Sequence, residues 1–246
     1  VYVSDDLDYD GVPDSIDPDS SLTTYTGQIV SYGDVCEHTN EYEGINYDGS
    51  NCTATCATYF SANYSMDYEL FLYSAATYRP ELAQVSSVAS TLVYHNRYWY
   101  DAETQADMEM DIDHWLEYHR MINVQRINIT GNDDHISEIA IGFRPVRNET
   151  LQTLVIAVII RGTNGTIEEW SSNMDIGDTR TFSQYPEWTT SAHHMGFDIT
   201  SNRIMEAVED YVEDNIPSMY SDYSHTYWVT GHSRGGALAN LVAAKL

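Results

Sequence analysis

Two short apolar segments, each followed by a helical pattern, constrain the fold of this chain more than any other feature. Residues 151–160 are mostly apolar and rich in β-branched side chains, and residues 227–230 form a second, shorter segment. Runs of this length and composition are typical of strands that are buried on both faces of a parallel sheet. Helical patterns follow at 196–215 and 234–246. The order strand, helix, strand, helix predicts an α/β fold with a mostly parallel sheet flanked by helices.

The middle of the chain predicts a hairpin preceded by helices. Residues 122–129 and 136–146 contain alternating apolar residues and are separated by Gly-Asn-Asp-Asp, which predicts an antiparallel hairpin. The spacing over 66–95 predicts two helices separated by Pro80. A third helix is predicted over 101–118, and its regularly spaced acids are interpreted as a solvated face.

The N-terminal part of the chain differs in composition from the rest. Residues 1–20 contain seven Asp and no base, which suggests an acidic linker. Residues 21–65 are rich in Tyr, Gly, Asn and Thr without a sustained period, and they are predicted to be a loop-rich cap that contains the cysteines. Residues 66–246 are therefore assigned to the α/β domain, with the first 65 residues as an N-terminal extension.

The charge of the chain excludes two classes of partner. The 38 acidic and 11 basic side chains give a formal charge of -27. A polyanion is repelled by phosphate backbones and by anionic membrane surfaces, so neither nucleic acid nor such a membrane is an expected partner. The longest unbroken apolar run, Leu154 to Ile160, is a strand length and far too short for a transmembrane helix.

Several features indicate an extracellular protein. The three cysteines favour a disulfide formed in an oxidising compartment, which leaves one thiol over, although three free thiols remain an alternative. A secreted protein whose signal has been removed would begin as this chain does, and so would a trimmed segment. Asn-x-Ser/Thr sequences permit glycosylation, and chance also explains them. The cysteines are Cys36, Cys52 and Cys56, and the sequons lie at Asn51, Asn63, Asn128, Asn148 and Asn164.

The segment Gly231-His232-Ser233-Arg234-Gly235 matches the pattern G-x-S-x-G between the second apolar run and its helix. In a nucleophile elbow the serine occupies a tight, strained turn, and residues two positions away must be very small. The start of the following helix places amide groups where an oxyanion would form. The segment therefore predicts a catalytic serine, the alternative being an ordinary glycine-rich turn.

Residues 231–239 resemble the nucleophile segment of the class 3 lipases, the fungal-type triacylglycerol lipases of the α/β-hydrolase superfamily. Arg161-Gly162-Thr163, followed by Trp170 and Asn173, resembles the oxyanion loop and the start of the lid in this family. Residues 194–197, with the sequence His-Met-Gly-Phe, resemble its H-x-G-F segment. The resemblance covers residues 136–246.

The resemblance implies a role for each matching residue. Ser233 would attack the ester carbonyl, and the backbone amides of Thr163 and Arg234 would hold the oxyanion, with the Thr163 hydroxyl as a third donor. Trp170 would lie in or beside a lid over the acyl pocket, unless it is an ordinary packing residue. His194 is interpreted as structural. The expected substrates are acylglycerols or other carboxylic esters.

The chain departs from the family pattern after Ser233. Family members place an acid and then a histidine after the serine, but residues 234–246 contain no Asp, Glu or His. A serine without a base is a poor nucleophile. Three explanations are considered: a fold truncated after the elbow, a second chain that completes it, or a non-catalytic extracellular structural or adhesive protein that reuses it. We favour a secreted ester hydrolase whose triad is completed by a missing C-terminal segment or a second chain.

The acidic N-terminus predicts a calcium loop of the kind found in thrombospondin type 3 repeats. Ca²⁺ takes six to eight oxygen ligands from a sharply turning loop, and Gly11 stands at the sixth loop position, where the turn is made. The alternative is a solvated acidic tail. The ion would be structural, because the lipase chemistry does not need it. The expected ligands are Asp6, Asp8, Asp10, the carbonyl of Val12, Asp14 and Asp17.

Overall fold

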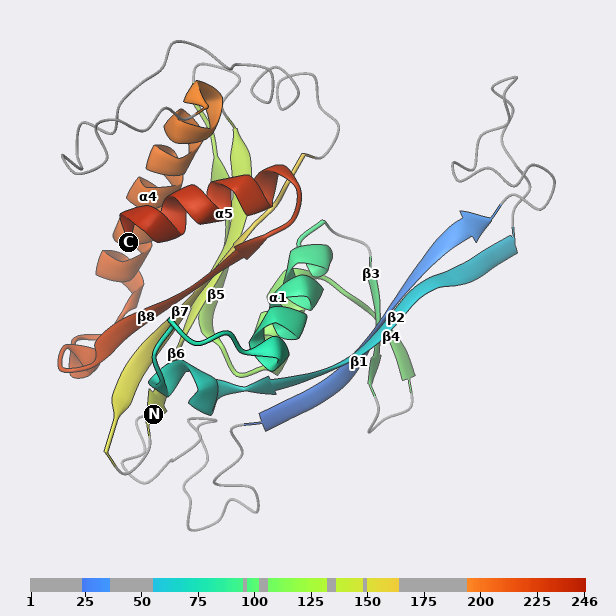
Figure 1. Cartoon of the computed structure of the whole chain (residues 1–246), viewed down its shortest axis with the longest axis horizontal. Coiled ribbons are helices and arrows are strands. Elements are labelled where there is room, and N and C mark those ends of the chain that lie inside the picture. The colour runs from blue at the N-terminus through green and yellow to red at the C-terminus, as the bar shows by residue number, and fades with distance from the viewer. Residues whose placement is uncertain are drawn as a thin grey trace.

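The strands of the computed structural model form two four-stranded sheets, ordered β2-β1-β3-β4 and β5-β6-β7-β8 (Figure 1). The residues that the structure describes are 24–35, 55–94, 97–101, 106–131, 136–147, 150–163 and 194–246. The first sheet comprises β1 (Thr24–Val35), β2 (Thr55–Asp67), β3 (Arg97–Asp101) and β4 (Ala106–Met110). The second comprises β5 (Ile122–Ile129), β6 (Ser137–Arg147), β7 (Gln152–Ile160) and β8 (Ser224–Gly231).

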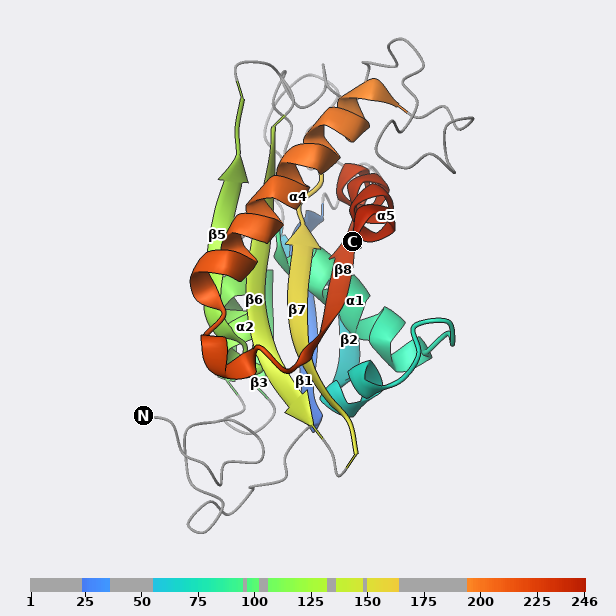
Figure 2. The same cartoon turned by 90° about the vertical axis from the view of Figure 1, so that its left-hand side faces the viewer.

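Helices cover both faces of the second sheet (Figure 2). One face packs against α4 and α5, and the other packs against α1 and α2. None of the described helices is both long and apolar enough to cross a membrane. The helices are α1 (Pro80–Leu92), α2 (Ile112–Tyr118), α4 (Met195–Asn215) and α5 (Arg234–Lys245), with short 3₁₀ turns η1 (Tyr68–Leu72) and η3 (Ser218–Tyr220).

Strand β7 is the central strand of this two-sided packing. Leu154, Ile156 and Val158 belong to the core beneath α4 and α5, whereas Val155 and Ala157 belong to the core beneath α1 and α2. Successive side chains of a strand point to opposite faces, so an unbroken apolar sequence fills both cores. The strand predicted from the apolar run is confirmed, as are the hairpin of β5 and β6 and the helices α4 and α5.

The prediction of a mostly parallel sheet was wrong for the described strands. β5 pairs with β6, and β6 with β7, in antiparallel fashion, and β7 with β8 in parallel. The short connection after Arg147 brings β7 back alongside β6, which requires antiparallel pairing. A long crossover that includes α4 separates β7 from β8 and permits parallel pairing. The sheet is therefore mixed, and it remains compatible with an α/β fold.

The chain before residue 118 contains more strand than the sequence predicted. Strands β1 and β2 form a long antiparallel hairpin where a loop-rich cap was expected, because their many Thr and Tyr residues favour strands despite the intervening turn residues. The helix predicted just before Pro80 is reduced to η1. The helix predicted over 101–118 is confined to α2, which starts where the Asp111 side chain accepts a hydrogen bond from the amide of His114.

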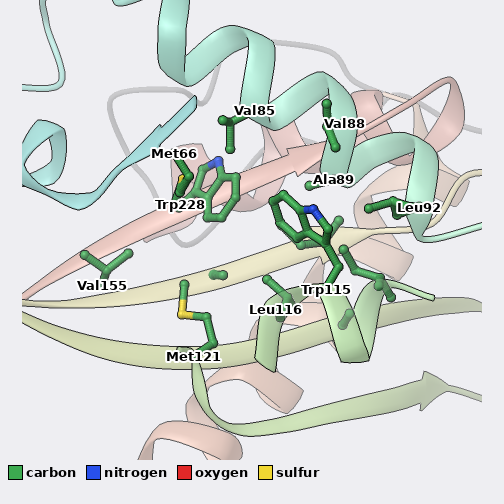
Figure 3. Close-up of a cluster of buried hydrophobic side chains, with 14 of the residues drawn as sticks. Met66, Val85, Val88, Ala89, Leu92, Trp115, Leu116, Met121, Val155 and Trp228 are labelled. Carbon is green, nitrogen blue, oxygen red and sulfur yellow. The ribbon is translucent and has the colours of Figure 1, made fainter. Parts of the chain in front are cut away.

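Two tryptophan rings lie among aliphatic side chains in the core beneath α1 and α2 (Figure 3). Trp115 of α2 is fully buried, and its indole nitrogen donates a 2.9 Å hydrogen bond to the hydroxyl of Tyr64. Trp228 of β8 donates a 2.9 Å hydrogen bond to the Ser86 hydroxyl of α1. These bonds satisfy the indole donors of two large rings, and they link α2 to β2 of the first sheet and α1 to β8 of the second.

His119 is a fully buried imidazole in the same core. Its Nδ1 lies 2.6 Å from the carbonyl oxygen of Trp115, which can only accept, so Nδ1 carries the proton and Nε2 is an acceptor. Nε2 is buried and has no hydrogen-bond partner among the described residues. Burial lowers the pKa of the imidazole to about 3; the positive charge of Arg144 acts in the same direction, and the bond to Trp115 opposes it.

The pKa of His119 predicts acid sensitivity. Between about pH 6.5 and pH 3 the unfolded chain binds a proton at this residue and the folded chain does not, so stability falls as the pH falls. In His119→Phe this contribution is absent. Denaturant unfolding from pH 7 to pH 4 should show the free energy of unfolding of the parent falling by about 1.4 kcal/mol more per pH unit than that of the variant below pH 6. Parallel pH profiles for the two proteins would contradict the assignment.

Candidate active site

The backbone of Ser233 is held in a conformation that side-chain-bearing residues rarely adopt. Ser233 lies between the end of β8 and the start of α5, with φ 57° and ψ -126°. Such a conformation costs on the order of 1–3 kcal/mol and persists only where the surrounding structure enforces it. The turn leaves the Ser233 side chain exposed. This geometry is that of a serine held outward at a sharp strand-to-helix turn.

The glycines around Ser233 are required by close backbone contacts. A Cβ at Gly231 would lie 2.5 Å from the carbonyl oxygen of Gly235 and 2.7 Å from that of Ile160. A Cβ at Gly235 would collide with the Ile160 carbonyl and lie 3.0 Å from the amide nitrogen of Gly162. Any larger residue would therefore separate the elbow from the end of β7.

The structure brings Thr163 and Ser233 to one cavity. Strands β7 and β8 are parallel and paired up to Ile160 and Gly231, so the segments that follow them leave the same edge of the sheet. Both residues line a cavity of about 310 Å³ at this edge. The described residues that line it are Ser90, Thr91, Tyr94, Thr163, His232 and Ser233. A larger cavity of about 340 Å³ lies along β8 and α1 and includes neither Thr163 nor Ser233.

Arg234 contributes to the elbow through its backbone and its side chain in different ways. It is the first residue of α5, where backbone amides carry the positive end of the helix dipole. Its guanidinium is buried, with Nη1 donating a 2.7 Å hydrogen bond to the carbonyl of Ile136 and Nη2 a 3.2 Å bond to the Thr200 hydroxyl. The side chain therefore anchors the elbow to α4 and to Ile136, the residue just before β6, and it is the backbone that is suited to an oxyanion.

Four of the described lining residues were not found by sequence reasoning: Ser90, Thr91, Tyr94 and His232. Tyr94, just after α1, donates a 3.2 Å hydrogen bond to the backbone carbonyl of His232, and its hydroxyl lies 3.3 Å from the His232 Nδ1. A Cβ at Gly162 would collide with this hydroxyl. Tyr94 therefore contacts both the elbow and the loop that contains Thr163. The position of His232 inside G-x-S-x-G could have drawn attention to it, whereas nothing in the sequence pattern indicated Tyr94.

Gly162→Ala is expected to lower kcat for ester hydrolysis by about 100-fold, because displacing a positioned group by about 1 Å has an effect of this size. The new methyl group would meet the Tyr94 hydroxyl and would lie 2.5 Å from the carbonyl oxygen of His232, so the loop and the elbow must separate. Steady-state kinetics checks the prediction, with Gly131→Ala as the control, since its Cβ would meet only the flexible Arg203 side chain. A Gly162→Ala enzyme with the parent kcat would contradict it.

The remaining predicted site residues are placed as follows. His194 caps α4, its Nδ1 accepting a 3.4 Å hydrogen bond from the Phe197 amide, which agrees with a structural role. Trp170 and Asn173 lie outside the described residues, and so do all six predicted calcium ligands (Asp6, Asp8, Asp10, Val12, Asp14 and Asp17), Cys36 and Cys52. For Cys56 only the backbone, in β2, is described. The lid, the calcium loop and a disulfide therefore remain predictions.

The family model described as Lipase (class 3) matches residues 157–246. The matched region starts within β7 and includes Thr163, α4, β8, Ser233 and α5. No curated protein and no solved structure matches the chain. The match supports a lipase or esterase type of hydrolase for this region, with an ester or lipid as the class of substrate.

Proposed function

We propose that this chain carries the nucleophile and the oxyanion hole of a secreted serine hydrolase that cleaves acylglycerols or other carboxylic esters. The observation that carries the proposal is the strained backbone of Ser233, whose side chain shares a cavity with Thr163. The family match over residues 157–246 supports the same chemistry. A helix N-terminus beside an exposed serine places backbone amides where an oxyanion would form, which a glycine-rich turn alone does not do.

The reaction would proceed through an acyl-enzyme. The Ser233 oxygen attacks the ester carbonyl carbon while its proton passes to a base, and the carbonyl oxygen becomes an oxyanion. The amides of Thr163 and Arg234, with the Thr163 hydroxyl, would stabilise that oxyanion. Collapse of the intermediate breaks the bond to the alcohol, which takes the proton from the base, and water then releases the acid by the same two steps.

Activation of Ser233 needs a base and an acid that orients it. Among the described residues that line the cavity, the only imidazole is that of His232, and there is no carboxylate. His232 is next to Ser233 in the chain, and its Nδ1 faces the Tyr94 hydroxyl. We therefore assign the triad acid and base to a segment or chain that is not among the described residues.

Two accompanying properties follow from the sequence and complete the proposal. Residues 1–20 would bind structural calcium through Asp6, Asp8, Asp10, Val12, Asp14 and Asp17. The chain would act outside the cell, with a disulfide among its cysteines. A chelator should then increase protease cleavage within residues 1–20, whereas unchanged cleavage there would argue against the calcium loop.

The test of the main proposal is covalent labelling of the intact natural protein. A fluorophosphonate probe reacts with activated serines, and mass spectrometry of the digested adduct locates the modified residue. Labelling at Ser233 together with hydrolysis of a short-chain p-nitrophenyl ester is the expected result. An intact protein that is neither labelled at Ser233 nor active would instead favour the alternative, a non-catalytic structural or adhesive protein that reuses this fold.

A further inference from the structure

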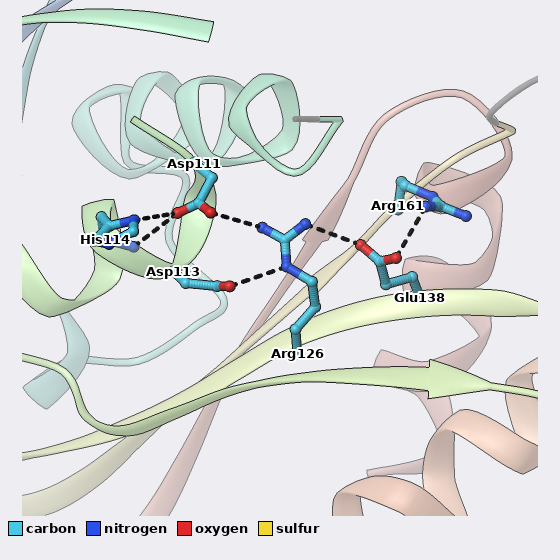
Figure 4. Close-up of polar contacts among 6 residues, drawn as sticks. All are labelled: Asp111, Asp113, His114, Arg126, Glu138 and Arg161. Atoms are coloured by element: carbon cyan, nitrogen blue, oxygen red, sulfur yellow. Dashed lines mark hydrogen bonds and ion pairs between the residues drawn. The ribbon is translucent and has the colours of Figure 1, made fainter. Parts of the chain in front are cut away.

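Glu138 is a buried carboxylate that pairs with two guanidinium groups at once (Figure 4). Its Oε2 accepts a 2.9 Å hydrogen bond from Nη1 of Arg161, and its Oε1 accepts a 3.2 Å bond from Nη1 of Arg126. The side chain of Glu138 is 8% exposed, and those of Arg161 and Arg126 are 13% and 15% exposed. At this depth the pairs are poorly screened by solvent, and each charge depends on its partners.

Arg161 directly follows β7, which ends at Ile160, and it begins the loop to Thr163. Its backbone amide donates a 2.9 Å hydrogen bond to the carbonyl of Glu138, so the same residue of β6 holds both the main chain and the side chain of Arg161. Two attachments at one residue restrict both the position and the direction of the chain that leaves it. Thr163 is only two residues further along.

Through Arg126 of β5, Glu138 is also linked to α2. Nε of Arg126 donates to both carboxylate oxygens of Asp113, at 3.2 Å and 3.1 Å, and Nη2 lies 3.8 Å from Asp111. Arg126 therefore has anionic partners other than Glu138, namely Asp113 on α2 and Asp111 at its N-cap, and Glu138 is also paired with Arg161. A change at Asp113 should disturb Arg126 and leave the pair of Glu138 and Arg161 in place.

We propose that Glu138 is a positioning residue that holds the oxyanion loop, residues 161–163, through the guanidinium and backbone of Arg161. The inference rests on the proposed function, since a donor at Thr163 matters only if an oxyanion forms beside Ser233. Glu138 itself does not line the described cavity, so it acts through Arg161 and makes no contact with substrate. The pair of charges sets the geometry of the loop and thereby the rate of acyl transfer.

The test uses the intact protein and the variants Glu138→Ala, Glu138→Gln and Asp113→Asn. Loss of the carboxylate frees the loop, so Glu138→Ala should lower kcat about 100-fold with KM within about threefold. Glu138→Gln keeps one side-chain oxygen that can accept a hydrogen bond, so it should lower kcat only about tenfold. This variant also provides the test if Glu138→Ala does not fold. Asp113→Asn is the matched control, which disturbs Arg126 and should keep kcat within about twofold.

Hydrogen exchange separates this inference from the proposed function. Amides of the peptide containing residues 161–163 should exchange at least about tenfold faster in Glu138→Gln than in the parent or in Asp113→Asn. If the parent is inactive but this exchange difference is found, the proposed function fails and the holding role of Glu138 stands. Unchanged exchange in Glu138→Gln, a change in KM instead of kcat, or an equal loss of kcat in Asp113→Asn would each overturn the inference.

Discussion

Ser233→Ala is expected to lower kcat for hydrolysis of a short-chain ester by about 10⁴-fold or more in the intact protein, and to abolish labelling by a fluorophosphonate. The hydroxyl is the only group at this turn that can form the acyl-enzyme, and loss of a nucleophile leaves only the catalysis provided by binding and the oxyanion hole. Alanine accepts the strained backbone about as well as serine, so the elbow itself should persist. Initial rates and adduct mass spectrometry measure both effects.

The matched control for this prediction is Ser87→Ala. Ser87 is an exposed serine on α1 that does not line the cavity. The variant should retain the parent kcat and the parent labelling, since it removes an exposed hydroxyl that does not line the cavity. A Ser233→Ala protein that hydrolyses the ester as fast as Ser87→Ala would show that another group carries the chemistry.

Trp115→Ala should lower the free energy of unfolding by about 3–5 kcal/mol, as large aromatic deletions in cores do. The indole is fully buried, and its ring lies near those of Tyr64, His119 and Trp228, with centroids 5.7, 4.2 and 6.4 Å away. Removing it leaves a cavity and also removes the hydrogen bond that the indole donates to the Tyr64 hydroxyl. Such a loss is a large share of the stability of an ordinary domain. Urea denaturation measures it.

Two further variants test the cause of this effect. Trp115→Phe keeps most of the ring volume and loses the hydrogen bond, so its loss should be smaller, about 1–3 kcal/mol. Tyr78→Ala removes an aromatic ring that is 79% exposed, and the free energy of unfolding should change by less than about 0.5 kcal/mol. Equal losses in Trp115→Ala and Tyr78→Ala would mean that the core beneath α1 and α2 is not organised around Trp115.

The elements that the sequence predicted well are those whose pattern repeats over a long stretch. The alternating hairpin at 122–146 and the amphipathic α4 each carry a period that indicates one type of structure, and the apolar run in β7 is short and rich in β-branched residues, which favours a buried strand. The segments predicted less well, such as 66–79 and 101–110, have a helical spacing of side chains over too few residues to exclude strands or turns. The strands in and beside these segments are stabilised by pairing: β2 and β3 pair with β1, which lies far from β3 in the sequence, and β4 pairs with β3.

The candidate site also has a part that the sequence predicted and a part that it did not. The sequence alone determined the strand, the tight turn and the helix around Ser233, because a turn that steep tolerates only glycine at Gly231 and Gly235. Only the tertiary structure decided what lies beside the serine. The parallel pairing of β7 with β8 brings Thr163 to the same cavity, and the ion pair of Glu138 with Arg161 joins residues that are 23 positions apart. Contacts of this kind depend on sheet register, which a local pattern of residue types does not specify.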